Sequence, residues 1–319
     1  MAAGLLLATT GCKMVVMDPA GDIALQQRNL VLLSTALMLL IIIPVILMTL
    51  FIAWKYRASN TDAPYDPEWH HSTRIEVAVW AAPLAIIMVL GTVTWITCHT
   101  LDPYRPLSRL SATQPLPSGV KPLEVDVVAL DWKWLFIYPE LGVATVNELA
   151  APVDRPIAFK ITSNTVMNSF YVPALAGQIY AMPGMETQLH AVINKPGEYE
   201  GFSANYSGAG FSDMKFKFKG LQPAAFDQWV AGVRANAGQM DRTAFSALAQ
   251  PSIAEPVRRF ATVDPTLFSD ILDQCATPGA VCARDVMHAA SGHDPVQLAA
   301  AEKILCEPQA LPAQSRPAP

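Results

Sequence analysis

Three polar side chains in the middle of the chain, Asn168, Ser203 and Ser207, are of types that could bind a ligand or attack a substrate. A serine acts as a nucleophile only when a base lies beside it. His190 is the single histidine between residues 122 and 220, and it belongs to an alternating, strand-like pattern. This pattern disfavours a hydrolase, and we expect these polar side chains to hydrogen-bond one another in the interior.

The spacing of one segment matches a known copper-binding loop. Ser203, Ser207, Phe211 and Met214 follow one another at intervals of four, four and three residues. In subunit II of the cytochrome c oxidases, the matching loop carries two cysteines, a histidine and a methionine, which bind the dinuclear copper centre CuA. Asn168 stands where that family has its second copper histidine. Hydroxyl, amide and phenyl groups do not replace thiolate and imidazole as copper ligands. The resemblance therefore implies a vestigial site and no metal on this chain.

The resemblance extends over roughly residues 12 to 275. Over this range the chain is similar to haem-copper oxidase subunit II of the cytochrome bo type, which is a subunit of ubiquinol oxidases. It implies a two-helix transmembrane hairpin, an all-β cupredoxin-like Greek-key barrel and short C-terminal helices. The stretches that carry it are Trp54 to Asn60, Asp131 to Trp134, Ile137 to Glu140, Asn164 to Pro173, Gln178 to Met182 and Ala225 to Val230.

Composition independently indicates a membrane part and a globular part. The 319 residues are 52% hydrophobic and only 15% charged, which is too apolar for an ordinary soluble protein. Two apolar runs, Leu30 to Trp54 and Ile75 to Thr97, are each close to the roughly 20 residues that a helix needs to cross a bilayer. The net charge is −5 and no basic cluster occurs, so nucleic acid is excluded as an expected partner.

The N-terminus and the connecting loop give two indications of orientation. Three basic residues in the loop from Lys55 to Arg74 weakly favour a cytoplasmic loop. Leu5 to Cys12 resembles the end of a bacterial lipoprotein signal, with Cys12 as the lipid attachment residue. Thr9 departs from that pattern, and no basic residue precedes the apolar stretch. Two interpretations of this segment stay open: a signal that leads to lipidation of Cys12, and a degenerate signal. Lipidation would place both termini in the periplasm.

Alternating apolar residues predict strands from about Pro122 to Lys219. The clearest runs are Ile157, Phe159 and Ile161; Leu189, Ala191 and Ile193; and Met214, Phe216 and Phe218. Helices are expected to return after Leu221, where Phe226, Trp229, Val230 and Val233 form an apolar stripe at helical spacing. Asp264-Pro265 is expected to begin a further helix. The predicted divisions are a signal-like and periplasmic segment 1–29, a membrane hairpin 30–98, a linker 99–121, a cupredoxin domain 122–220, a helical arm 221–275 and a variable, partly disordered tail 276–319.

Two cysteines near the C-terminus flank a turn. Cys275 and Cys282 surround Pro278-Gly279, so in an oxidising compartment they could form a small disulfide loop. Two free thiols are the equally weighted alternative. A zinc site is disfavoured, because His288 and His293 lie nearby without a second close cysteine pair.

Glu76 is the acidic residue at the mouth of the second apolar run. A carboxylate there is costly unless it meets water or a partner. In the family that the chain resembles, a glutamate at this place marks the cytoplasmic entrance of the lysine-type proton channel, whose body lies in subunit I. The resemblance implies proton uptake at Glu76. The alternative is an interfacial residue that is solvated or paired with Arg74.

Trp132 and Trp134 lie in a segment whose first tryptophan passes electrons to CuA in the cytochrome c oxidases. Without copper that relay has no next step, so we expect packing of the aromatic region over subunit I.

Together these features predict a non-copper subunit II of a proton-pumping quinol oxidase in the bacterial inner membrane, with its C-terminal domain in the periplasm. The resemblance assigns the haems, one copper and the quinol site to subunit I, and it implies further small membrane subunits and membrane lipid as partners. Two alternatives are a CuA-type cytochrome c oxidase subunit II and a free-standing, membrane-anchored cupredoxin-like assembly lipoprotein.

Overall fold

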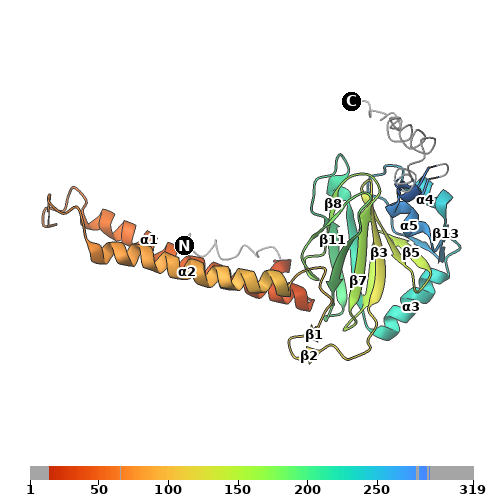
Figure 1. Cartoon of the computed structure of the whole chain (residues 1–319), viewed down its shortest axis with the longest axis horizontal. Helices are drawn as coiled ribbons and strands as arrows, with labels where there is room; N and C mark the ends of the chain where they lie inside the picture. Colours follow the sequence, from red (N-terminus) through yellow and green to blue (C-terminus); the bar gives the residue numbers. More distant parts are fainter. Residues whose placement is uncertain (1–13, 65, 278–279, 286, 288–319) are drawn as a thin grey trace, which may run out of the picture.

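The protein consists of a long helical hairpin and a β-rich domain that lie end to end along the longest axis of the molecule (Figure 1). The computed structural model describes residues 14–64, 66–277, 280–285 and 287. Cys12, His288, His293 and most of the C-terminal tail therefore lie outside the described residues.

The hairpin is formed by α1 (Asp22–Lys55) and α2 (Thr73–Thr100). Their 34 and 28 residues, at 1.5 Å per residue, give lengths of about 50 and 40 Å, more than the ~30 Å of a bilayer's hydrocarbon core. Apolar side chains along both helices are exposed, among them Trp80 at 77% and Leu40 at 63%. These are helices of a kind that can cross a membrane.

Helix α1 begins eight residues earlier than the apolar run suggests, at Asp22 rather than Leu30. The additional two turns are polar on one side and bury Ala24 at 4% exposure. Hydropathy marks only the part of a helix that suits lipid, so it does not detect a continuation that packs against protein.

The β domain is built from two sheets that face each other. One sheet has the order β10-β7-β3-β4-β5-β14 and the other the order β6-β12-β11-β8-β9. The first contains β3 (Leu123–Leu130), β4 (Lys133–Tyr138), β5 (Val143–Val146), β7 (Ile157–Ser163), β10 (Thr187–Ala191) and β14 (Arg258–Phe260). The second contains β6 (Glu148–Pro152), β8 (Asn168–Tyr171), β9 (Ile179–Ala181), β11 (Gly197–Ser203) and β12 (Lys215–Leu221). The cupredoxin-like fold expected from the sequence is confirmed.

The chain passes from the first sheet to the second at Asn147, which lies between β5 and β6. Asn147 has φ 56°, a left-handed conformation that asparagine tolerates better than most residues. Its side-chain oxygen accepts a hydrogen bond from the backbone N–H of Trp134 at 2.9 Å, and its side-chain amide donates to the Glu255 backbone carbonyl at 2.8 Å. One side chain thus fixes the corner between the sheets and holds the later C-terminal segment.

The main core fills the space between the two sheets. Residues at alternate positions of β3, including Leu123, Val125 and Val127, point into it and are fully buried. Helix α3 (Pro223–Arg234) adds Phe226, Trp229, Val230 and Val233 to this core, as the predicted apolar stripe requires.

A second core lies on the outer face of the six-stranded sheet. Val128 and Leu130 of β3 pack there against Phe245 of α4 (Arg242–Leu248) and Leu267 and Ile271 of α5 (Leu267–Leu272). The short strands β13 (Gln239–Met240) and β15 (Thr262–Val263) pair in the same arm. Beside the membrane hairpin, β1 (Arg109–Ser111) pairs with β2 (Gln114–Pro115).

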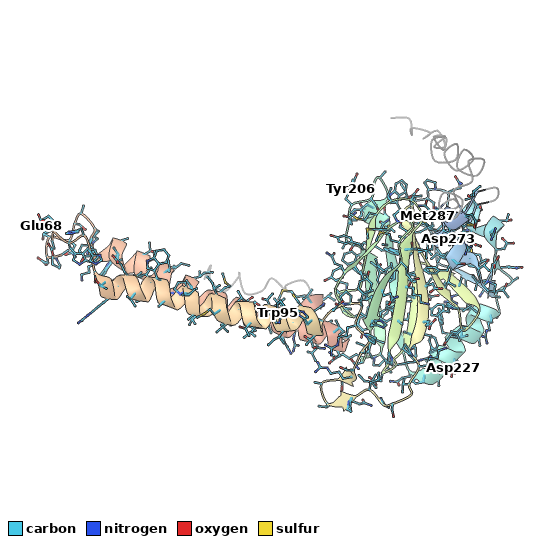
Figure 2. All side chains as sticks on the ribbon, in the orientation of Figure 1. Glu68, Trp95, Tyr206, Asp227, Asp273 and Met287 are labelled. Atoms are coloured by element: carbon cyan, nitrogen blue, oxygen red, sulfur yellow. A yellow bond between two sulfur atoms is a disulfide. The ribbon has the colours of Figure 1, made fainter. Side chains whose placement is uncertain are left out.

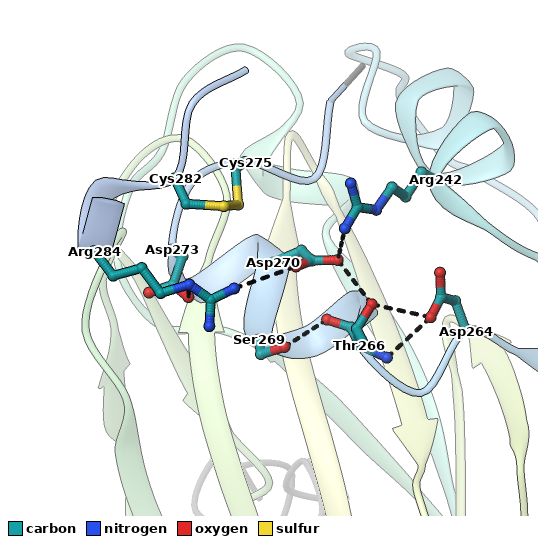
Figure 3. Close-up of polar contacts among 9 residues, drawn as sticks. All are labelled: Arg242, Asp264, Thr266, Ser269, Asp270, Asp273, Cys275, Cys282 and Arg284. Atoms are coloured by element: carbon teal, nitrogen blue, oxygen red, sulfur yellow. Dashed lines mark hydrogen bonds and ion pairs between the residues drawn. A yellow bond between two sulfur atoms is a disulfide. The ribbon is translucent and has the colours of Figure 1, made fainter. Parts of the chain in front are cut away.

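The predicted start of α5 was wrong by two residues. The N-cap is Thr266 rather than Asp264. Asp264 instead accepts hydrogen bonds from the Thr266 N–H and hydroxyl, at 2.9 and 3.1 Å, and so closes the turn before the helix (Figure 3). Asparagine and aspartate side chains form such turns as readily as they cap helices.

Cys275 and Cys282 form a disulfide, which decides between the two alternatives left open by the sequence. It lies beside Asp270, which is buried at 2% exposure. Asp270 accepts hydrogen bonds from Arg242 of α4 at 2.5 Å and from the Thr266 hydroxyl at 3.0 Å (Figure 3). The carboxylate and the disulfide together fasten α4, α5 and the following segment to one another.

The β domain is fixed to the helical hairpin at the start of α1. Asp22 is 3% exposed and accepts hydrogen bonds from Arg109 at 2.8 and 3.2 Å. The preceding Gly21 lies directly against the barrel: a Cβ there would be 2.5 Å from the Val192 carbonyl oxygen and 2.7 Å from that of Leu175. Any residue other than glycine at this position would force the backbone to move.

We expect Gly21→Ala to lower the free energy of unfolding of the β domain by about 2 kcal/mol, because the new methyl group must push apart two backbone segments. Denaturant titration of the full chain in detergent, followed by tryptophan fluorescence, measures the change. Gly232→Ala is the matched control: nothing lies within 4 Å of that position on α3, and a gain of roughly 0.5–1 kcal/mol is expected. Equal stability of Gly21→Ala and the wild-type chain would contradict the close approach.

Candidate functional site

Three of the residues at positions that match the copper loop, Asn168, Ser203 and Met214, come together at one end of the barrel from three separate segments. Asn168 begins β8, Ser203 ends β11, and Met214 directly precedes β12. Asn168, Ser203 and Met214 are all buried, at 1%, 2% and 0% exposure. The strand pairing that aligns Ser203 with Phe170 places the two former ligand segments beside each other.

Hydrogen bonds within the protein satisfy the buried polar groups at these positions. The Ser203 hydroxyl donates to the Asn168 side-chain oxygen at 3.0 Å, and the Ser169 N–H lies 3.4 Å from the Ser203 hydroxyl oxygen. The Asn168 amide donates to the Val166 carbonyl at 3.2 Å. The expectation that Asn168 and Ser203 bond each other is confirmed.

Ser207 and Phe211 do not join that pair. The Ser207 hydroxyl lies 3.9 Å from the Met214 sulfur, and the Phe211 ring packs edge-on against Tyr206 with 5.6 Å between centroids. Tyr206 is 75% exposed and lies at the end of the barrel (Figure 2). The available donors are hydroxyl and amide groups and a single thioether, a set that does not fit a dinuclear copper centre.

Trp132 covers the loop that would have surrounded the metal. Its indole N–H donates to the Ser207 carbonyl at 3.1 Å. A Cβ at Gly210 would lie 2.5 Å from the Trp132 ring, so the ring and the loop backbone are in direct contact. Packing against the indole ring therefore helps to hold the loop in place.

Trp134 is fully buried in the main core. It contacts Phe170 and Phe216 edge-on, at centroid distances of 5.5 and 5.8 Å. Both tryptophans have a packing role within this chain; whether the aromatic region also packs over subunit I stays a prediction.

The hydrolase arrangement does not form. His190 lies half-buried beside a cavity of about 280 Å³ between the hairpin and the barrel, with Gln27, Arg105 and Gln178 among its lining residues. Burial lowers the pKa of the His190 imidazole below its ordinary value. Among the described residues, the polar contacts of the Ser203 hydroxyl are Asn168, the Ser169 backbone N–H and the Asn205 carbonyl, and none of these is a base.

Within the described residues, no three His, Cys, Asp or Glu side chains lie close enough to hold a metal ion. Cys275 and Cys282 are joined to each other, which removes them as zinc ligands.

Glu76 lies at the other extreme of the molecule, in the first turn of α2. Glu68, in the loop that joins the two helices, marks this end in Figure 2, far from the barrel. The Glu76 carboxylate lies 2.7 Å from the His71 Nδ1 atom, and both side chains are more than half exposed. The partner of Glu76 is therefore His71 and not Arg74. Sequence reasoning missed His71; its only sequence signal is its position, five residues before Glu76 and just outside the helix.

Comparisons with known proteins identify the family. Residues 125–220 match the family described as "Cytochrome C oxidase subunit II, periplasmic domain", and residues 234–279 match "COX Aromatic Rich Motif". The "Cytochrome bo(3) ubiquinol oxidase subunit 2" of Pseudomonas putida is 51% identical over 269 residues, which are 84% of this chain and 83% of that protein. This chain belongs to the quinol oxidase subunit II family.

Other members of the quinol oxidase subunit II family agree. The "Ubiquinol oxidase subunit 2" of Acetobacter aceti is 51% identical over 85% of both chains. The "Quinol oxidase subunit 2" of Bacillus cereus is 35% identical over 78% of this chain and 84% of that one. Among solved structures, the periplasmic domain of subunit II of cytochrome oxidase from Bradyrhizobium japonicum is 22% identical and covers 34% of this chain and 91% of that chain, with a TM-score of 0.34.

The donor chemistry of this quinol oxidase subunit II predicts that the wild-type chain binds no copper. The combined substitutions Asn168→His, Ser203→Cys, Ser207→Cys and Phe211→His should restore binding of two copper ions, with Met214 already in place. Metal analysis and the purple mixed-valence absorption after copper addition measure the result. The control is the variant that carries only Asn168→His and Phe211→His, which should not develop the purple absorption. Stoichiometric purple copper in the wild-type chain would contradict the prediction.

Proposed function

We propose that this chain is the subunit II, without a redox centre of its own, of a proton-pumping quinol oxidase that couples quinol oxidation to the reduction of oxygen to water. The observation that carries the proposal is the former copper site, where Ser203 and Asn168 bond each other in a buried position. A chain with no electron acceptor suits an enzyme in which quinol delivers electrons directly to subunit I.

The remaining surfaces support a structural role in such a complex. Both long helices present apolar side chains over most of their length, including Trp80 and Trp95 at 77% and 70% exposure. Burial of this much apolar surface requires lipid or other membrane helices. We assign it to the membrane helices of subunit I and of further small subunits, and to membrane lipid. Subunit I would carry the haems, one copper and the quinol site.

We assign the chain to the bacterial inner membrane, where it crosses twice, with the β domain in the periplasm. The disulfide between Cys275 and Cys282 suits an oxidising compartment. Since the connecting loop and the β domain lie at opposite ends of the hairpin (Figure 1), a hairpin that spans the bilayer places the loop in the cytoplasm. Lipid attachment at Cys12 would add a periplasmic anchor.

Two measurements on the purified complex test the proposal. Oxygen uptake should be supported by a quinol and not by reduced cytochrome c, and the copper-to-haem ratio should lack the two additional ions of a CuA centre. Cytochrome c oxidation with the higher copper ratio would instead support a CuA-type subunit. Isolation of the chain free of any haem protein after mild detergent extraction would support the assembly lipoprotein.

Glu76 is the residue to which we assign proton uptake. It is a carboxylate in the first turn of α2, at the loop end of the hairpin. Its side chain is 52% exposed, so it can exchange protons with water on that side. The adjoining membrane subunit would continue the path.

Glu76→Ala should slow oxygen reduction by the whole complex at least about tenfold, because the carboxylate that would pass protons onward from the helix mouth is then missing. Glu76→Asp should retain more activity, since a shorter carboxylate still exchanges protons. Turnover, haem content and the KM for quinol are measured together; haem content and KM should not change.

Glu68→Ala is the matched control for Glu76→Ala, because Glu68 is an exposed carboxylate in the same loop without a contact to Glu76. Its turnover should equal that of the wild-type complex. If Glu76→Ala turns over at the wild-type rate across the pH range, the proposal of proton uptake is wrong and Glu76 is only a residue at the membrane interface.

A further inference from the structure

The loop end of the hairpin holds a second titratable group in direct contact with Glu76. We infer that His71 is a positioning and proton-collecting residue that loads the Glu76 carboxylate, an inference that rests on the proposed proton entrance at Glu76. Nothing in the sequence pattern distinguished His71 from the neighbouring His70; the structure does.

The two ring nitrogens of His71 have different partners. Nδ1 lies 2.7 Å from the Glu76 Oε1 atom, and Nε2 lies 3.2 Å from the Thr73 hydroxyl oxygen. The backbone of Glu76 is fixed as well, because its N–H donates to the Ser72 carbonyl at 3.0 Å. The imidazole is therefore oriented with one nitrogen toward the carboxylate and the other toward a hydroxyl group.

Exposure leaves His71 accessible to protons from water. Its side chain is 57% exposed and that of Glu76 is 52% exposed. Among the described residues, neither side chain forms an ion pair with any other group. The other charged groups among the described residues of this end are Asp62, Asp66, Glu68 and His70 in the loop, Arg74 in the first turn of α2, and Lys55 and Arg57 at the end of α1.

Histidine is suited to collect protons at neutral pH and a carboxylate is not. A carboxylate side chain is ordinarily ionised at neutral pH and seldom carries a proton there. Imidazole is the side chain whose charge ordinarily changes across the neutral range. A histidine beside the carboxylate thus supplies a nearby acid far more often than the carboxylate captures a proton alone.

The transfer balances without any further reactant. Water delivers a proton to Nε2 of a neutral His71 whose Nδ1–H points at Glu76, which gives the imidazolium. The Nδ1 proton then moves to the Glu76 carboxylate, and the imidazole is left neutral with its proton on Nε2. After Glu76 passes its proton onward, exchange with water returns the ring to the Nδ1–H form. The Thr73 hydroxyl, beside Nε2, can carry the incoming proton.

The test uses the complete oxidase complex with a saturating quinol, between about pH 6 and pH 8.5. His71→Asn keeps an amide that can donate a hydrogen bond to Glu76 but cannot titrate. We expect its oxygen uptake to fall roughly threefold to tenfold at neutral pH and its rate to decline from a lower pH than that of the wild-type complex. His70→Asn is the matched control, since the His70 ring contacts the Glu68 carbonyl at 2.6 Å; its pH profile should match wild type.

Chemical rescue separates proton collection from support of the loop. Added imidazole should restore most of the rate to His71→Ala, because a free imidazole can deliver the proton, and should not restore Glu76→Ala. Haem content verifies assembly of each variant. A wild-type rate and pH profile for His71→Asn would overturn the inference, as would a loss in His71→Ala that imidazole does not restore. If the Glu76→Ala complex turns over at the wild-type rate, the proposed proton entrance at Glu76 is wrong. If Glu76→Ala is slow but the His71 variants turn over at the wild-type rate, only the role of His71 is wrong.

Discussion

An ion pair between the buried carboxylate of Asp22 and the partly exposed Arg109 holds the β domain on the helical hairpin. A buried carboxylate without its partner would be strongly unfavourable, so the first turn of α1 and the segment after α2 must meet at this point. Asp22 is 3% exposed, and Arg109 contacts both of its oxygens. Gly21 makes that meeting possible, since its missing Cβ leaves room for two carbonyl oxygens of the barrel. The barrel is thus fixed to the helices and not merely tethered to them.

The former copper site keeps its shape because neighbouring packing and hydrogen bonds support it. The Trp132 ring lies against Gly210, and Met214 is fully buried. Ser203 and Asn168 satisfy each other's polar groups in the interior, where an unpaired polar group would cost free energy. The barrel end therefore serves as a packed structural surface, and the titratable pair of His71 and Glu76 lies at the opposite end of the hairpin. The segment that matches the copper loop and the proposed proton entrance thus lie at opposite ends of the chain.

Patterns that depend on local periodicity could be predicted from the sequence alone. Two apolar runs indicated the membrane helices, and alternation of Ile157, Phe159 and Ile161 indicated β7, because burial repeats with the period of each element. The stripe that includes Phe226 and Trp229 likewise identified α3. The change of ligand types in the former copper loop needed only residue identities and spacing, so the family could be identified without the structure.

Contacts between distant or irregular segments were decided only by the tertiary structure. The polar start of α1 packs on the barrel, and β14 pairs with β5 to form the edge of the six-stranded sheet; neither segment has a strong local pattern. The disulfide required Cys275 and Cys282 to meet in the folded arm, with 4.7 Å between their Cα atoms. The sequence by itself determined the family, the membrane helices and the missing copper ligands. Only the tertiary structure placed His71 on Glu76, because a side chain just outside a helix can turn in several directions and spacing does not specify which one it takes.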